Sequence, residues 1–138
     1  MTTTPVLFVP GLLCSTEIFE AQAAALWRLG PITIASTLDG DTVEEVAETI
    51  LKTAPPQFAL AGISMGGYIS LEIMRQAPER IIRLALLDTT ARPDTSAQTA
   101  QRRLMLEQAQ KGDFVSIAVA SLTSLVHPEG RGELRLRE

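Results

Sequence analysis

Short apolar runs alternate along the chain with longer segments in which apolar residues recur at helical spacing. The short runs are rich in aliphatic and β-branched residues and are nearly continuous, which is typical of strands that are covered on both faces of a parallel sheet. Their alternation with helical segments predicts an α/β fold in which helices wrap a parallel sheet. The predicted strands are residues 5–9, 32–35, 58–61 and 81–87.

The segments between these runs predict helices over residues 17–29, 42–53 and 65–76. In the second helix, Asp41 is expected to cap the first turn while Glu44 reaches back to the cap. The apolar positions of that helix fall on one face, which is expected to turn toward the sheet. The third helix is expected to end before Pro78, because proline cannot continue a helix.

The pattern changes after Asp88. A polar, proline-containing stretch leads into two further predicted helices, residues 100–110 and 113–125, with Gly112 between them. No additional strand is evident. The last residues carry glycines and alternating charges with little to bury, so residues 128–138 are predicted to form a frayed tail.

Composition narrows the class of protein. The sequence has 138 residues, of which 46% are hydrophobic, and a formal net charge of −4. A chain of this size can bury a core without disulfides or metals, which excludes collagen-like, disordered and disulfide-scaffold proteins. Without a cluster of lysine and arginine a nucleic-acid partner is not expected, and the apolar runs are too short to span a membrane. One cysteine, Cys14, and a start unlike a secretory signal favour the cytoplasm.

The most informative motif is the sequence GISMG at residues 62–66, followed by Gly67. It is a G-x-S-x-G pattern between a predicted strand and a predicted helix, which is the setting of a nucleophile elbow. Glycines are needed there because side chains would collide with neighbouring backbone. Ser64 would stand at a helix N-terminus, where free amides favour negative charge. The alternative is a tight turn without chemistry.

A second constellation follows the first predicted strand, where Pro10 and Gly11 turn the chain. In acyl-transfer sites, such a loop supplies one backbone amide of the oxyanion hole, and the residue after the nucleophile supplies the other. The candidates are the N–H groups of Leu12 and Met65. The alternative is that Pro10 and Gly11 merely turn the chain and Leu12 and Leu13 fill the core.

These residues together resemble the N-terminal half of a bacterial α/β-hydrolase. The resemblance rests on the loop VPGLLC at residues 9–14, the elbow GISMGG at 62–67 and the segment 77–93, and it covers roughly residues 5–127. It implies a three-layer sandwich around a four-stranded parallel sheet, a truncated α/β-hydrolase fold, with lid-type helices at its C-terminal end. One departure is Pro10, where the family usually has histidine.

The resemblance implies a triad in the order serine, acid, histidine, with the acid and the histidine after later strands. Neither later strand is present in this sequence. The one histidine, His127, has no strand before it and is in the wrong place for the general base. Asp88 ends the fourth predicted strand, where some members of the family carry their acid, although a capping or loop aspartate is the more ordinary explanation.

The expected function is therefore that of a serine hydrolase acting on a small ester, thioester or lactone, without its histidine and without its acid. Domain organisation follows the resemblance, with a core at residues 1–94, the start of a helical lid at 95–127 and the tail at 128–138. No cofactor and no metal site are expected, since no cluster of ligands has metal-binding spacing. The alternative is a non-catalytic binding or assembly module with a flavodoxin-like layer, in which the helix start at Ser64 holds an anion.

The strand order in space is expected to be second, first, third, fourth, with all strands parallel. Residues 81–87 would then form an unpaired edge whose only charge is Arg83. Exposed edges of this kind template pairing with another chain, so we expect self-association besides the binding of a small acyl substrate.

Overall fold

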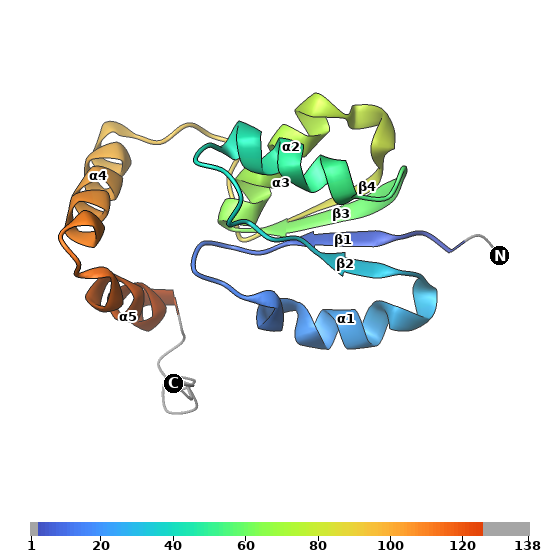
Figure 1. Ribbon diagram of the computed structural model, residues 1–138, viewed down its shortest axis with the longest axis horizontal. Coiled ribbons are helices and arrows are strands. Elements are labelled where there is room, and N and C mark those ends of the chain that lie inside the picture. The colour runs from blue at the N-terminus through green and yellow to red at the C-terminus, as the bar shows by residue number, and fades with distance from the viewer. Residues whose placement is uncertain (1–2, 126–138) are drawn as a thin grey trace. The chain divides into compact units, whose positions relative to one another are not determined.

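The computed structural model describes residues 3–125. The chain divides into two compact units, Met1–Ala91 and Arg92–Glu138. The first unit contains a four-stranded sheet in the order β2-β1-β3-β4 (Figure 1). All three neighbouring pairs are parallel, so the predicted order and direction are confirmed.

The strands lie close to their predicted positions. They are β1 (Val6–Val9), β2 (Ile32–Ile34), β3 (Phe58–Ile63) and β4 (Ile81–Leu87). The third strand runs two residues further than predicted, because Gly62 and Ile63 continue the ladder with Leu86 and Leu87 of β4. This extension brings the end of β3 to the residue before Ser64.

The first predicted helix is not one regular helix. It consists of a 3-10 turn at Thr16–Phe19, the α-helix α1 (Glu20–Leu26) and a second 3-10 turn at Trp27–Leu29. No residue of α1 is buried. Because short helices gain most of their stability from packing, little holds this segment to regular α-helical geometry.

The cap of the second helix, α2 (Val43–Thr53), is shifted by one residue from the prediction. Thr42 is the N-cap, and its hydroxyl accepts a hydrogen bond from the N–H of Glu45 at 3.2 Å. The Glu45 carboxylate accepts in return from the amides of Thr42 and Asp41. The predicted box of Asp41 and Glu44 is therefore wrong, because the extended residue whose side chain faces the first turn is Thr42.

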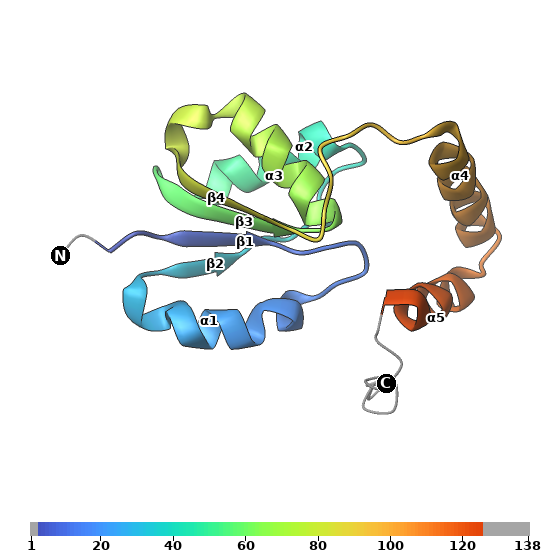
Figure 2. The same ribbon diagram turned by 180° about the vertical axis from the view of Figure 1, so that it is seen from behind.

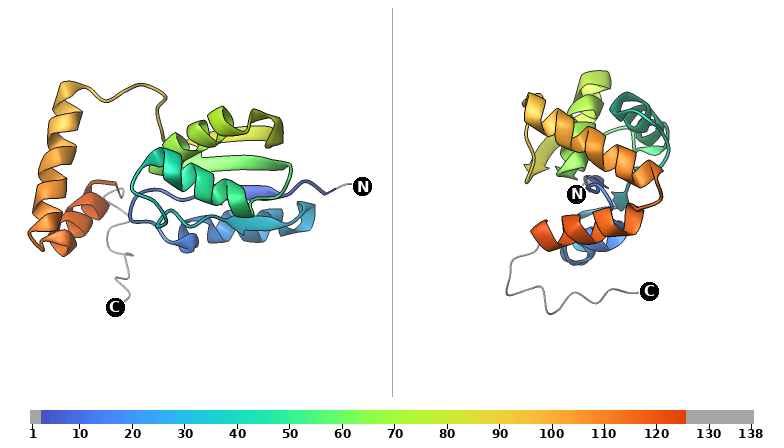
Figure 3. Two further views of the ribbon diagram at one scale, coloured as in Figure 1. Left: turned by 45° about the horizontal axis from the view of Figure 1, so that its top comes forward. Right: turned by 90° about the vertical axis from the view of Figure 1, so that its left-hand side faces the viewer.

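Helices cover both faces of the sheet. On one face, α2 and α3 (Met65–Gln76) lie side by side and enclose the larger core (Figure 3). On the other face, Phe19 stacks on Phe8 with 4.4 Å between ring centroids, which seats the α1 segment (Figure 1). The three-layer arrangement is thus confirmed. The larger core consists of Leu7, Val9, Val46, Ala47, Ile50, Phe58, Leu60, Ile69 and Ile73.

The fourth strand departs from the expectation that all strands are covered on both faces. Every residue from Ile82 to Leu87 is exposed, and Leu86 keeps 40% of its surface. The reason is its place in the sheet: β4 is the last strand, beyond the helices that cover its neighbours (Figure 2).

The second unit contains α4 (Ser96–Gln110) and α5 (Phe114–Leu125), with Gly112 between them at a φ of 92°. Helix α4 begins four residues before its predicted start, because Thr95 and Gln98 form a capping box. The tail predicted at residues 128–138 lies outside the described residues. The boundaries predicted at residues 94 and 127 stay predictions. None of the described helices is both long enough and apolar enough to cross a membrane.

Candidate active site

Ser64 occupies the turn between β3 and α3 in a strained backbone conformation. Its φ is 54° and its ψ is −117°, a region that residues with a side chain rarely adopt. Such strain persists only where the surroundings impose it, and it gathers at functional sites. The Ser64 side chain makes no capping hydrogen bond to α3 and is exposed. The hydroxyl is therefore presented to solvent at the helix N-terminus.

Three hydrogen bonds hold the Ser64 backbone in this turn. Its N–H donates to the carbonyl of Leu87 at 3.0 Å, and its own carbonyl accepts from the N–H of Gly67 at 2.9 Å. The Thr89 hydroxyl donates to the same carbonyl oxygen at 2.8 Å. Two of the three bonds come from Leu87 at the end of β4 and from Thr89 just after it, so this end of the sheet fixes the serine although the residues of β4 from Ile82 to Leu87 are exposed.

Two glycines of the motif are required by close approach. A β-carbon at Gly66 would strike the carbonyl oxygens of Val9 and Pro10, at the end of β1. One at Gly62 would strike the Gly66 carbonyl and the Ser70 hydroxyl, which is buried and donates to that same carbonyl at 2.7 Å. The first turn of α3 can therefore lie directly against the ends of β1 and β3.

The loop after β1 packs against the serine. A β-carbon built at Gly11 would lie 3.4 Å from the β-carbon of Ser64. The loop then turns, with the N–H of Cys14 donating to the Gly11 carbonyl at 3.2 Å and Leu13 at a φ of 60°. Leu12 is 53% exposed, so the alternative in which Leu12 and Leu13 fill the core is wrong.

The predicted oxyanion residues, Leu12 and Met65, are next in sequence to Gly11 and Ser64 respectively. Leu12 follows the glycine that touches the serine, and Met65 is the first residue of α3. The first amides of a helix have no carbonyl one turn earlier to bond, so the Met65 N–H is available to an acceptor. Among the described residues, no backbone hydrogen bond of a turn or loop uses the Leu12 N–H.

Asp88 lies at the same edge of the sheet as Ser64. It stands between Leu87 and Thr89, both of which bond the Ser64 backbone, and it has a φ of 43°. Its side chain is exposed. His127 lies outside the described residues.

Curated relatives of this chain are esterases. It is 27% identical over 104 residues to a pimeloyl-(acyl-carrier protein) methyl ester esterase of Aromatoleum aromaticum, an alignment that covers 71% of this chain and 42% of that protein. It is 51% identical over 43 residues to an enzyme of the same name from Hamiltonella defensa, which covers 31% of this chain and 17% of that protein. The chain thus matches less than half the length of either relative.

Solved structures that resemble this chain are also esterases and hydrolases. A thermophilic esterase from Thermogutta terrifontis superposes with a TM-score of 0.77 and 26% identity, over 94% of this chain and 53% of that one. The α/β hydrolase domain-containing protein 10 from mouse matches with a TM-score of 0.53 and 25% identity, over 65% of this chain and 42% of that one. The chain has the fold of part of an α/β-hydrolase. No family model matches it.

In the first unit of the chain, a cavity of about 530 Å³ opens beside the loop that packs on Ser64. Its volume is within the range of small-molecule sites. Cys14 is half-buried in its wall, with its thiol 3.5 Å from the Leu12 carbonyl. The wall combines two loops, from β1 with Pro10, Leu13, Cys14, Ser15 and Thr16, and from β2 with Ile34, Ala35, Ser36, Thr37 and Leu38.

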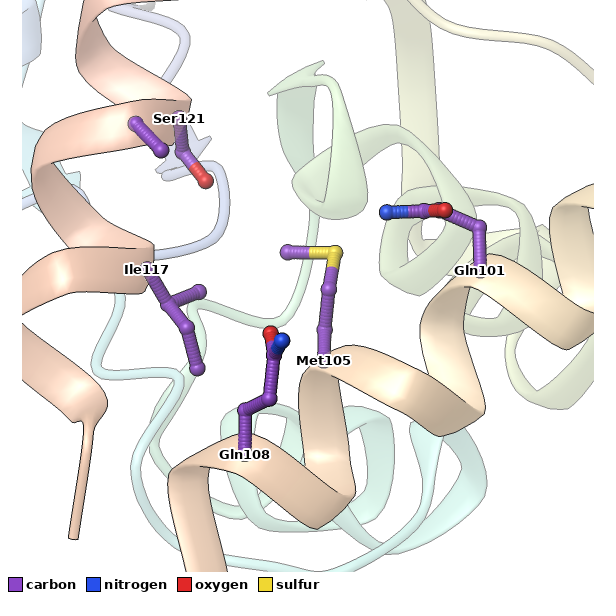
Figure 4. Close-up of a pocket in the computed structure, with 6 residues that line it drawn as sticks. Gln101, Met105, Gln108, Ile117 and Ser121 are labelled. Atoms are coloured by element: carbon purple, nitrogen blue, oxygen red, sulfur yellow. The ribbon is translucent and has the colours of Figure 1, made fainter.

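A separate cavity of about 270 Å³ belongs to the second unit of the chain. Met105 and Gln108 of α4 project into it, as do Ile117 and Ser121 of α5 (Figure 4). Among the residues that the structure describes, those lining this cavity include no titratable side chain. Within residues 3–125 the structure also holds no group of carboxylate, cysteine or histidine side chains that could bind a metal ion.

Thr89 belongs to the site through its bond to the Ser64 carbonyl, and no sequence motif points to it directly. A signal was available in Gly67, the second glycine of the pair, because a β-carbon there would strike the Thr89 side chain. A glycine in the first turn of the helix after the elbow therefore indicates that a side chain from the end of the next strand packs closely against that turn.

Proposed function

We propose that Ser64 is the nucleophile of an acyl-transfer site and that this chain carries the nucleophile and oxyanion part of a serine hydrolase. The observation that most supports this proposal is the strained backbone of Ser64, which is exposed between β3 and α3 and has a φ of 54° and a ψ of −117°. Strain of this kind exposes a hydroxyl on a rigid turn, which is the requirement for attack on a carbonyl.

In the proposed reaction, the Ser64 oxygen forms a bond to the carbonyl carbon of the substrate while its proton passes to a base. The carbonyl π electrons move onto oxygen, and the amides of Leu12 and Met65 stabilise that oxyanion. Collapse expels the alcohol, thiol or ring oxygen and leaves an acyl-serine, which water then hydrolyses. The positive end of α3 favours the same negative charge.

The base is the part that we propose to be missing from the described residues. His127 is the only histidine of the sequence, and it lies outside them. Asp88 lies at the edge of the sheet, where it could orient a histidine. The hydroxyl of Ser64 therefore stays protonated in this proposal, and positioning is present without activation.

We propose a small ester, thioester or lactone as the substrate. The names of the two curated relatives as methyl ester esterases support an ester. The cavity beside the Ser64 loop supports a small acyl group, because apolar residues such as Leu13, Ile34 and Leu38 supply much of its lining. We propose that the reaction takes place in the cytoplasm, which the single cysteine supports.

The proposed function is tested by supplying the base from solution. Hydrolysis of p-nitrophenyl acetate is followed at increasing imidazole concentration for the wild-type chain and for Ser64→Ala, which preserves the fold of the turn. The expected result is an imidazole-dependent rate in the wild type above that of the variant, together with an acetyl group on Ser64 in mass spectrometry. Equal rates in the two proteins and no acetyl group on Ser64 would show that Ser64 is not a nucleophile. The G-x-S-x-G segment would then be only a tight turn, or the start of a helix that binds an anion.

A further inference from the structure

The peptide group that joins Ser64 to Met65 accepts hydrogen bonds at one end and offers the proposed oxyanion donor at the other. Its carbonyl oxygen accepts from the Gly67 N–H at 2.9 Å and from the Thr89 hydroxyl at 2.8 Å. A carbonyl oxygen has two lone pairs, so both are engaged. Its N–H is that of Met65, the first residue of α3, which has no helical partner.

Hydrogen bonds to a carbonyl oxygen strengthen the N–H of the same peptide group as a donor. The peptide bond has partial double-bond character, and a donor at the oxygen favours the form with a negative oxygen and a positive nitrogen. The N–H then carries more positive charge. For this reason hydrogen bonds in a chain strengthen one another, by about 10–30% per bond.

A second hydroxyl acts one peptide group further into α3. The Ser70 side chain is fully buried, and its hydroxyl donates to the Gly66 carbonyl at 2.7 Å. That carbonyl shares a peptide group with the Gly67 N–H, which donates to the Ser64 carbonyl. The hydroxyls of Thr89 and Ser70 therefore polarise the chain in the same direction, toward the Met65 N–H.

Each of these hydroxyls lies where a glycine of the motif makes room for it. A β-carbon at Gly67 would strike the Thr89 hydroxyl, and one at Gly62 would strike the Ser70 hydroxyl. A side chain that only filled the space beside Gly67 would need the shape of threonine but not its hydroxyl. The two roles, packing and polarisation, can therefore be separated by valine, which has the same shape.

We propose that Thr89 strengthens the Met65 N–H as an oxyanion donor by polarising the Ser64–Met65 peptide group, with a smaller contribution from Ser70. The inference rests on the proposed function, which assigns that N–H to the oxyanion. Thr89 is a positioning residue in this proposal, because it acts through the peptide group and not on the substrate. A stronger donor stabilises the charged transition state more than the bound, neutral ester, so its loss lowers kcat and leaves KM unchanged.

The kinetic experiment measures kcat and KM for p-nitrophenyl acetate at a fixed imidazole concentration. Removing a whole oxyanion donor lowers kcat by about 10²–10³, so losing about 10–30% of that stabilisation lowers it roughly two- to eightfold. We expect this loss in Thr89→Val, recovery in Thr89→Ser and a smaller loss in Ser70→Ala. The matched control is Thr53→Val, which removes a hydroxyl bond to the Ile50 carbonyl at 3.3 Å, at the end of α2. It is expected to leave kcat unchanged.

Nuclear magnetic resonance reads the polarisation without the reaction. The Met65 amide proton is expected to move upfield in Thr89→Val, as it becomes less positive, and to keep its wild-type position in Thr89→Ser and Thr53→Val. An unmoved Met65 signal in Thr89→Val would overturn the inference. Circular dichroism checks that every variant is folded as the wild type is.

The kinetic outcomes separate this inference from the proposed function. A wild type faster than Ser64→Ala, with Thr89→Val as fast as the wild type, would overturn the inference and leave the nucleophile in place. Equal losses in Thr89→Val and Thr53→Val would overturn it as well, because lost stability would then explain both. Equal rates in the wild type and Ser64→Ala would refute the proposed function itself, and the inference with it.

Discussion

The hydroxyl of Thr89 donates a hydrogen bond to the backbone carbonyl of Ser64 at 2.8 Å, across the gap between the end of β4 and the start of α3. The Thr89 side chain also lies where a β-carbon of Gly67 would be. Thr89 therefore holds the turn from two directions, through the carbonyl and against the first turn of the helix. The geometry of the elbow depends on β4 as well as on the glycines of the motif.

Replacing Thr89 by valine is expected to destabilise the chain by about 1 kcal/mol, because the shape is kept while one hydrogen bond to the Ser64 carbonyl is lost. Thr89→Ser, which keeps the hydroxyl, is expected to recover most of the lost stability. The free energy of unfolding in urea checks both variants. Equal stability of Thr89→Val and the wild type would show that the Gly67 amide alone satisfies the carbonyl.

Gly66 and Gly11 are expected to respond very differently to alanine. The β-carbon of Gly66→Ala would collide with the backbone carbonyls of Val9 and Pro10, which cannot move without displacing β1. We expect a loss of more than about 3 kcal/mol or a failure to fold. Gly11→Ala is the control, since its nearest neighbours are at 3.4 Å, and we expect a change within about 1 kcal/mol. Comparable losses in both variants in thermal unfolding would contradict this account.

The positions of the strands can be predicted from the sequence because the pattern that marks each strand lies within the strand itself. The runs that form β1, β3 and β4 are apolar in continuous stretches, and the elbow glycines are explained by the turn that they permit. The cap of α2 was misplaced because Asp41, Thr42, Glu44 and Glu45 all have the chemistry of a capping box. Only the backbone conformation decides which of them faces the first turn.

Interactions between distant segments could not be predicted in the same way. The bond from Thr89 to Ser64 joins residues that are 25 positions apart. Gly67 indicates that some group approaches the start of α3, but the sequence does not say that this group is the Thr89 hydroxyl or that it bonds the Ser64 carbonyl. The exposure of β4 likewise depends on what lies beside it, which its apolar sequence does not encode. The oxyanion amides of Leu12 and Met65 stay a prediction, although the packing of Gly11 on Ser64 brings their segments together.

The stability of the chain is expected to fall in acid through Glu72 of α3. Hydrogen bonds from Arg75 and then from Gln76 lower the pKa of Glu72 to about 2, from an ordinary value of 4.5. Because the folded pKa is the lower one, the stabilisation is present above pH 4.5 and is lost as the pH falls toward 2. Gln76 also donates to the Glu44 carbonyl of α2, so this group joins the two helices.

Glu72→Gln is therefore expected to lower the free energy of unfolding by about 1 kcal/mol at pH 7. It is also expected to make the free energy of unfolding depend less on pH in acid. The expected loss is small because solvent screens the interaction with the exposed Arg75. The control is Glu48→Gln, since Glu48 pairs with Lys52 at 3.3 Å with both side chains about two-thirds exposed. That pair is expected to contribute less than about 0.5 kcal/mol. Urea unfolding at pH 7 and pH 3 measures both, and an unchanged acid limb in Glu72→Gln would contradict the assignment.

The most direct test of the central claim, a positioned serine without a base, is the hydrolysis of p-nitrophenyl acetate by the wild type, Ser64→Ala and His127→Ala with no imidazole present. In a serine protease, removing the base lowers kcat by a factor on the order of 10⁶, about as much as removing the nucleophile or the whole triad. Once the base is absent, removing the nucleophile as well therefore lowers kcat little further. We therefore predict that the three proteins hydrolyse the ester at nearly the same low rate. Fast turnover that disappears in both variants would contradict the claim by showing that His127 is the base, and fast turnover that survives Ser64→Ala would show that the elbow is not the site of the chemistry.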